Sequence, residues 1–531
     1  MAQRSKLSPE LVPIRKNLKE LLPILNIEKD WYVSIFFEKK ANRSFTANLK
    51  QTQVSDQMSM GAVFRIYDGY TLFEQATDDL SENALKLFAQ EFAERVKSSV
   101  PPNGATRRPY SAATWTERLK APLENEITAQ IPKNPSPQTE VHFGIRFQKN
   151  PKTFSAAENL SLLKSYIERC QKAALSAGFA AEELSYVMAR HSISEEESIF
   201  LDSETDMSQS LFRVALTLVT MSGADRTFIR MGGLGGMEAL ELEDQDFVTL
   251  VKDLKALKSA HRLEPGKYRV LFGPTLTGVL AHEAFGHSQE ADTCARGRSK
   301  AWDLHQSGQS VGNQHATILN NPAIFESGDE KGSEKGALYA AWGSYFFDEE
   351  GWLAQSQILL DQGQLKAPMT NLTSAIRLGV PRTANGKRES WANGVYTRQT
   401  NTYFSPGKKS LPELMGQLKD GFLALHPAGG MEDPKGMGIQ VGISYLQEVK
   451  DGKTTGKVFK GPAGGDIQMT GYTPDILNSI VDKSKIEFNS SAPDRMQHPF
   501  NDAGGCGKYH KEFVYAGCGG PYVLLDHVTL G

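Results

Sequence analysis

Apolar and polar positions follow two different spacings along the first half of the chain. Apolar side chains recur at helical spacing in four stretches: residues 10–26, 83–101, 156–178 and 244–261. Alternating or aromatic and β-branched runs, typical of strands, occupy four others: residues 31–38, 139–147, 186–203 and 208–223. The last two runs are expected to pair with each other. Residues 101–138 are rich in Pro, Thr, Asn and Ser, which indicates a loop or linker.

The second half has few helix signals and many short apolar runs separated by turn residues. After a boundary predicted near residues 262–266, a short strand is expected, followed by a helix over residues 275–291. The fold class predicted from these patterns is α+β. We expect an N-terminal α+β domain over residues 1–262 and a large β-rich C-terminal domain over residues 263–531 that carries the 275–291 helix.

Length and composition limit the classes of protein to consider. A chain of 531 residues with 40% hydrophobic and 23% charged residues is typical of a globular protein of two or three domains. The formal net charge of −3 and the absence of a basic block give no reason to expect a nucleic-acid partner. No run of about 18 apolar residues predicts a membrane span, and no secretory signal is recognisable.

The chain has four cysteines, at positions 170, 294, 506 and 518. This number is too small for a disulfide scaffold in a chain of this length. Free thiols in a reducing compartment are the simplest interpretation, so a cytoplasmic protein is expected. Free thiols are also available as metal ligands or nucleophiles.

The segment "GVLAHEAFGHSQEAD", residues 278–292, carries the strongest chemical signal. It places His282, Glu283 and His287 in one predicted helix. Residues five apart on a regular α-helix differ by about 140° around the axis, so the two imidazoles could share one metal ion only if the helix is distorted. Gly286 is the least costly place for a distortion. A metal site therefore requires a bulge, a kink or an end at residues 284–287. Without one, His282 would be a core histidine and His287 a surface histidine.

A catalytic zinc site needs a third protein ligand. The nearby candidates are Glu290 and Asp292, and the distant candidates are Cys506, His510 and Cys518. Two histidines with a thiolate would favour zinc over hard cations. Glu283, beside the first histidine, is the candidate general base that would deprotonate a zinc-bound water. A peptidase also needs a group that stabilises the negatively charged oxygen (the oxyanion) formed during the attack. The weak candidates for this role are Arg398, His426 and His498.

The same segment resembles the HExxxH motif of the TldD/PmbA family of metalloproteases, including Gly286 and the acidic pair that follows His287. Further similar segments follow in the family's order: "FFDEEG" (346–351), "NGKRESWANGVYTRQTNTYFSPG" (385–407) and "CGK" (506–508). The likeness covers most of residues 225–531 and extends to the first 220 only in general layout. Among the departures, Gln399 stands where the family usually has an apolar residue.

The resemblance implies that His282, His287 and Cys506 bind zinc and that Glu283 is the catalytic base, with Cys518 left open as an alternative to Cys506. It further implies a dimer that encloses the site in a chamber reached by short or unfolded peptides. The dimer could be a homodimer or a heterodimer with a related subunit that lacks the motif. Because this chain keeps the motif, it resembles the active type of subunit.

Three functions are therefore compared. The first is a zinc-dependent peptidase that acts through attack of a metal-bound water on peptide substrates. The second is a metal-independent cysteine hydrolase that uses Cys506 as its nucleophile. The third is a non-catalytic binding or assembly subunit. Removal of the metal distinguishes the first from the second, and the Glu283→Gln variant distinguishes the first from the third.

Overall fold

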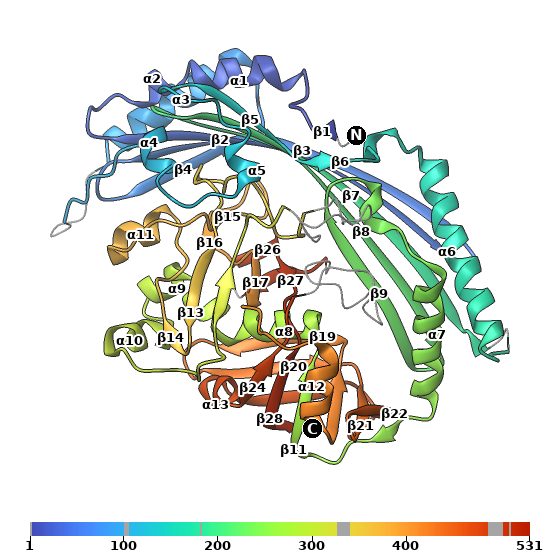
Figure 1. Ribbon diagram of the computed structural model, residues 1–531. Helices are drawn as coiled ribbons and strands as arrows, with labels where there is room; N and C mark the ends of the chain where they lie inside the picture. Colours follow the sequence, from blue (N-terminus) through green and yellow to red (C-terminus); the bar gives the residue numbers. More distant parts are fainter. Residues whose placement is uncertain (1–2, 100–105, 181–182, 326–339, 487–502, 509–510) are drawn as a thin grey trace.

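A curved seven-stranded sheet forms the N-terminal part of the computed structural model, which describes residues 3–99, 106–180, 183–325, 340–486, 503–508 and 511–531 (Figure 1). Its strands, in sheet order, are β4 (Leu72–Thr77), β3 (Thr52–Tyr67), β2 (Tyr32–Asn48), β7 (Tyr186–Asp202), β8 (Asp206–Ser222) and β5 (Glu140–Gly144), with β9 (Asp225–Leu234) also paired to β8. All pairs are antiparallel except β5 with β8. The predicted pairing of residues 186–203 with 208–223 is confirmed by β7 and β8.

Helices cover one face of this sheet. They are α1 (Leu11–Lys19), α2 (Leu22–Leu25) and α3 (Glu82–Lys97) at one end, and α6 (Ala156–Ser176) and α7 (Asp244–Lys258) at the other (Figure 1). Successive side chains of a strand point to opposite faces. On β2, Ile35 and Phe45 lie in the two cores beneath these helices. The opposite face, to which Phe36 on β2 and Phe200 on β7 belong, is called the inner face below.

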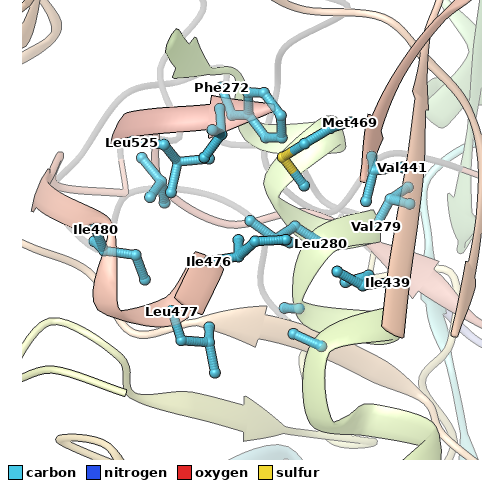
Figure 2. Close-up of a cluster of buried hydrophobic side chains, with 14 of the residues drawn as sticks. Phe272, Val279, Leu280, Ile439, Val441, Met469, Ile476, Leu477, Ile480 and Leu525 are labelled. Carbon is cyan, nitrogen blue, oxygen red and sulfur yellow. The ribbon is translucent and has the colours of Figure 1, made fainter. Parts of the chain in front are cut away.

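A ten-stranded sheet forms the centre of the C-terminal part. Its strands are β10 (His261–Arg262), β22 (Lys453–Lys460), β21 (Leu446–Lys450), β18 (Gly421–Ala424), β11 (Gly266–Phe272), β28 (Val523–Leu530), β23 (Ile467–Tyr472), β20 (Gly438–Ile443) and the edge strand β19 (Pro427–Asp433), with β24 (Ile480–Lys483) beside β28. Helix α8 (Pro274–Ala281) packs against this sheet, and Figure 2 shows its Val279 and Leu280 among apolar side chains of the sheet, including Met469 and Val441.

Smaller elements complete this part. A five-stranded sheet consists of β14 (Gln364–Leu365), β13 (Gln357–Asp361), β12 (Ile318–Asn320), β17 (Asn401–Phe404) and β27 (Gly517–Cys518). Two separate hairpins are formed by β15 (Gly386–Lys387) with β16 (Tyr396–Thr397) and by β25 (Gly505–Lys508) with β26 (Lys511–Tyr515). The short helices are α9 (Ala291–Ala295), α10 (Lys300–Ser307), α11 (Leu372–Leu378), α12 (Leu411–Leu418) and α13 (Thr473–Asn478). Helix α8 also contacts β17 and β27 and so lies between the ten-stranded and the five-stranded sheet.

The N-terminal and C-terminal parts share one of the apolar cores. Phe143 and Phe200 of the N-terminal sheet are buried in the same cluster as Phe346 and Leu353 of the C-terminal part. The structure is α+β, as predicted. The division of the chain at residues 262 and 263 stays a prediction, and the short strand β10 that ends there pairs with β22 of the C-terminal sheet.

One predicted segment is more ordered than its composition indicates. Residues 101–138, expected to be a loop or linker, carry α4 (Trp115–Arg118) and α5 (Asn125–Thr128). A capping box of Thr114 and Glu117 begins α4, and Trp115 and Ile127 are buried in the shared core. None of the helices in the described part of the chain has the length and apolar character needed to span a bilayer. All four cysteines are free.

Candidate metal centre

The predicted helix distortion is present at the proposed ligands. Helix α8 continues into one turn of π-helix, η4 (His282–Gly286), which inserts an extra residue before the next turn, η5 (His287–Gln289). Phe285 takes up the distortion with φ −147° and ψ 16°. The rings of His282 and His287 lie 4.7 Å apart between centroids. A π-turn therefore brings together two histidines that a regular helix would separate.

Gly286 and Gln399 fit this distorted turn closely. A Cβ atom at position 286 would lie 2.0 Å from Oε1 of Gln399, so only glycine fits without displacing that side chain. The Gln399 amide donates a hydrogen bond to the backbone carbonyl of His282 at 3.1 Å. Gln399 therefore satisfies a carbonyl of the distorted helix, which an apolar side chain at this position could not do.

Three side chains with metal-ligating atoms converge here. The ligand atoms of His282, His287 and Cys506 all lie within 4.8 Å of one another, and the three residues are buried. The sulfur of Cys506 is 3.4 Å from Nε2 of His287. Cys506 lies on β25, whereas the histidines follow α8, so the fold joins two segments 219 residues apart. Cys518 is not a member of this cluster.

The chemistry of this donor set fits a bound cation. Burial lowers the pKa of His282, which favours the neutral imidazole that metals bind. Burial alone would raise the pKa of the Cys506 thiol, but His287 and Arg398 more than offset it, so its pKa lies below the ordinary value. Nδ1 of His282 is buried and has no hydrogen-bond partner among the described residues. A cation would compensate such a concentration of buried donor atoms.

A second layer of polar side chains holds the proposed ligands in place. Oε1 of Glu290 lies 3.4 Å from Nδ1 of His287, and Nε of Arg398 lies 3.7 Å from the same carboxylate oxygen. Nη2 of Arg398 donates to the backbone carbonyl of Cys506 at 2.5 Å. One guanidinium therefore connects the carboxylate beside His287 to the strand that carries Cys506. Carboxylates that orient histidine ligands commonly occur around protein metal sites.

The cluster opens onto a cavity of about 590 Å³ between the two parts of the molecule. Glu283 lies in its wall beside the two histidines, and Gly429 and Gly430 of the edge strand β19 form another wall. A Cβ atom at position 430 would lie 2.7 Å from Cγ of Glu283, so the glutamate side chain packs directly over β19. The inner face of the N-terminal sheet closes the cavity through residues of β8 and β9.

The remaining candidates occupy different positions. Asp292 accepts a hydrogen bond from the backbone N–H of Thr397 at 3.3 Å, and Cys518 lines the cavity. His426 is buried beside Tyr445 and Asp253 and does not line the cavity, so it is not placed to stabilise an oxyanion there. His498 and His510 lie outside the described residues.

The contribution of β9 to this cavity was not predicted from the sequence. Arg226, Phe228 and Arg230 all line it. Their alternation in "DRTFIR" is the signal that could have identified a strand with one exposed face.

Comparisons with known proteins place the chain in a family. A model of the PmbA/TldA metallopeptidase C-terminal domain matches residues 265–531. A metalloprotease from Methanothermobacter thermautotrophicus is 27% identical over 395 residues, which are 73% of this chain and 77% of that protein. A zinc metalloprotease TldD homolog from Saccharolobus solfataricus is 28% identical over 266 residues, which are 50% of this chain and 52% of that protein.

The fold likeness extends beyond the matched domain. The crystal structure of TldE from Thermococcus kodakarensis has a TM-score of 0.63 to this chain at 14% identity, and the match covers 98% of this chain and 100% of the other. At this identity the likeness concerns the fold alone. The matched domain holds His282, Glu283, His287 and Cys506 and accounts for half of the sequence. The chain therefore belongs to the PmbA/TldD family of metallopeptidases.

Proposed function

We propose that this chain is a zinc-dependent peptidase of the cytoplasm that cleaves short or unfolded peptides. The convergence of His282, His287 and Cys506 beside Glu283, at the wall of one cavity, carries the proposal. Two imidazoles and a thiolate form a donor set that favours zinc. The zinc metalloprotease name of the Saccharolobus solfataricus relative supports this choice of metal. The four free cysteines fit a reducing compartment.

Each residue of the site has a distinct role in this proposal. His282, His287 and Cys506 would hold the zinc ion, a Lewis acid that would lower the pKa of a nearby water molecule to about 7. Glu283 would accept a proton from the attacking water and return it to the leaving amine. Glu290 and Arg398 keep His287 and Cys506 in position.

The edge strand β19 is the surface along which a substrate backbone would lie. It pairs with β20 on one side only, within the described residues, and its residues 429–431 are exposed. A peptide that adds to a sheet edge is held mainly through its backbone, so binding tolerates many sequences. Because Glu283 packs over Gly430, a peptide bound along β19 would pass the proposed base.

The proposal includes a dimer that restricts access to the site. The partner is either a related subunit that lacks the HExxxH motif, in a heterodimer, or a second copy of this chain, in a homodimer. In either case the enclosed cavity would admit extended peptides and exclude folded proteins. Size-exclusion chromatography with light scattering, alone and with a coexpressed relative that lacks the HExxxH motif, distinguishes the two assemblies.

The decisive experiment compares wild-type protein with Glu283→Gln on an unfolded peptide library, with metal content measured by elemental analysis. We expect both proteins to bind zinc and only the wild type to cleave. Equal cleavage by both would exclude Glu283 as the base and leave the peptidase proposal without its central residue. Arg377→Gln, on the exposed surface of α11, serves as the matched control and should cleave normally.

A cysteine hydrolase is the second candidate, because the Cys506 sulfur lies 3.4 Å from Nε2 of His287 and the pKa of its thiol is lowered. Chelation separates the two mechanisms. The zinc peptidase loses activity with a chelator and regains it when zinc is restored. A cysteine hydrolase keeps its activity in the chelator and loses it to a thiol-alkylating reagent, which would overturn the zinc proposal.

A further inference from the structure

The part of the cavity wall formed by β9 carries two arginines. On β9, Arg226, Phe228 and Arg230 point to the inner face, since they line the cavity. The residues between them point the other way. Ile229 is buried in the core beneath α6 and α7, and the Thr227 hydroxyl donates to the backbone carbonyl of Leu250 on α7. The two arginines therefore face the site as a consequence of the strand register.

The pairing of β9 with β8, and of β8 with β7, extends this surface across two more strands. Directly paired residues of neighbouring strands point to the same face. Arg230 pairs with Thr217 of β8, which pairs with Arg190 of β7. The surface, called the arginine floor here, consists of Tyr186, Met188, Arg190, Thr217, Val219, Met221, Arg226, Phe228 and Arg230. It contains three arginines and no carboxylate, and each of these arginines is exposed.

Few acidic side chains line the cavity to balance the charge of these arginines. Among the described residues that line it, Glu283 is the only carboxylate. Arg226 has no ion-pair partner within the described part of the chain, and the neighbouring Asp225 accepts from Lys460 instead. A cationic wall inside a confined space raises the local concentration of anionic ligands. Guanidinium groups bind carboxylates with paired hydrogen bonds, which gives them a preference for this group.

The floor also lies next to the proposed substrate path. The Phe228 ring lies 6.4 Å from the ring of His426, the residue before β19 begins. A peptide along β19 would therefore have β9 on its other side. Arg226 and Arg230, four residues apart on one strand, are separated by about 13 Å, so they would meet two different points of an extended peptide.

We propose that the arginine floor selects substrates that carry a carboxylate close to the cleaved bond. The carboxylate is an acidic side chain or the C-terminal carboxylate of a short peptide, since both present the same group to a guanidinium. This inference rests on the proposed peptidase function and adds a substrate preference to it. Apolar side chains of the floor, Phe228 among them, would contact the residues between the charged positions.

The experiment measures kcat/KM on peptides of one length that differ at single positions. Glu is compared with the isosteric Gln at each position in turn, and each peptide is made with a free and with an amidated C-terminus. We expect the wild type to prefer peptides that carry the recognised carboxylate by roughly tenfold or more, the scale of one charge-assisted hydrogen bond. A preference for Glu over Gln assigns the acidic side chain, and a preference for the free over the amidated C-terminus assigns the C-terminal carboxylate.

The variants are Arg226→Gln, Arg230→Gln and the double variant, with Arg377→Gln as the control. We expect the double variant to cleave peptides with and without the carboxylate at equal kcat/KM, and the control to keep the wild-type preference. Circular dichroism shows whether the variants are folded. The charge reversal Arg226→Glu should shift the preference toward Lys peptides.

Two failures are distinguishable. If the wild type cleaves the peptides and prefers neither Glu over Gln nor a free over an amidated C-terminus, or if the double variant keeps the preference, the arginine floor has no role in selection and the peptidase proposal stands. If the wild type loaded with zinc cleaves none of the peptides, the peptidase proposal itself fails, and the substrate inference fails with it.

Discussion

At the scale of single residues, the candidate site depends on groups that would be costly to bury without a cation. His282, His287 and Cys506 are each less than a tenth exposed. Buried polar groups without partners destabilise a fold by roughly 1–3 kcal/mol each. The structure records polar contacts of His287 with Cys506 and Glu290, and of Cys506 with Arg398. This arrangement is expected if the three side chains evolved around an ion.

The choice of Cys506 as ligand gives a direct prediction. Cys506→Ser should bind zinc substoichiometrically after dialysis, because an alcohol binds zinc much more weakly than a thiolate does. Cys518→Ser is the matched control and should retain its metal, since Cys518 stands outside the cluster. Elemental analysis of the two purified variants makes the comparison. Undiminished zinc in Cys506→Ser would refute the ligand set.

At the scale of elements, the π-turn depends on a close contact between Gly286 and Gln399. Gly286→Ala should displace the Gln399 amide and break its hydrogen bond to His282, at a cost of about 1–3 kcal/mol in unfolding free energy. Gln399→Ala removes the same bond. The two changes together should therefore cost less than their sum, which a double-mutant cycle by chemical denaturation measures. Strict additivity would show that the contact has no energetic role.

The elements differ in how far the sequence predicts them. The helix α6, the first half of β7 and the second half of β8 carry clear periodicity because each of them buries mainly one face. Strand β3 gives no such signal, since most of its first half is exposed and pairs only with β2. The HExxxH and Cys-Gly-Lys motifs contain the three residues that converge in the structure, and their role as ligands stays a prediction. The cavity was not predictable, because a local pattern can indicate strand β9 but not which part of the C-terminal half packs opposite it.

A buried histidine in β7 gives a prediction about pH. His191 is fully buried beneath the outer helices, its ring nitrogens have no hydrogen-bond partner among the described residues, and burial lowers its pKa to about 4. The unfolded chain binds a proton near pH 6.5 and the folded chain does not. Stability is therefore complete above pH 6.5 and falls as the pH drops toward 4. At pH 5 the loss is about 2 kcal/mol.

His191→Leu removes this titration and keeps the core apolar. The variant should lose less stability than the wild type when the pH is lowered from 7 to 5, as measured by urea unfolding followed by circular dichroism. His261→Leu, on the exposed strand β10, is the control and should behave like the wild type. An equal loss in His191→Leu and wild type would show that other groups dominate the acid response.

At the scale of the whole molecule, the two parts are held together by packing as well as by buried charge. Phe346 stacks on Phe143 of the N-terminal sheet with ring centroids 5.4 Å apart. Nη2 of Arg388 contacts Glu74 of the N-terminal sheet at 2.9 Å, and Nη2 of Arg213 donates to the carbonyl of Ser344 at 2.9 Å. The cavity between the two parts therefore has walls that are fixed relative to each other.

Phe346→Ala tests whether the parts are coupled. Removing this fully buried ring should cost about 3–5 kcal/mol. Because the core is shared, hydrogen exchange should become faster in β5 of the N-terminal sheet as well as around residue 346. Leu477→Ala, in the separate core beneath the ten-stranded sheet, is the control. Faster exchange confined to the C-terminal part of Phe346→Ala would mean that the two parts unfold independently.

The distance in sequence between the ligands has one more consequence. An ion held by His287 and Cys506 would act as a cross-link that closes a loop of 219 residues. Such a closure removes conformational freedom from the unfolded chain and links ion release to local unfolding. The hairpin of β25 and β26, which supplies Gly505, Cys506 and Gly507 to the cavity wall, would be held to the histidine turn by the ion in addition to the Arg398 contact. Chelation would then loosen part of the substrate channel as well as remove the catalyst, and faster protease nicking near the carboxyl-terminal hairpin would report it.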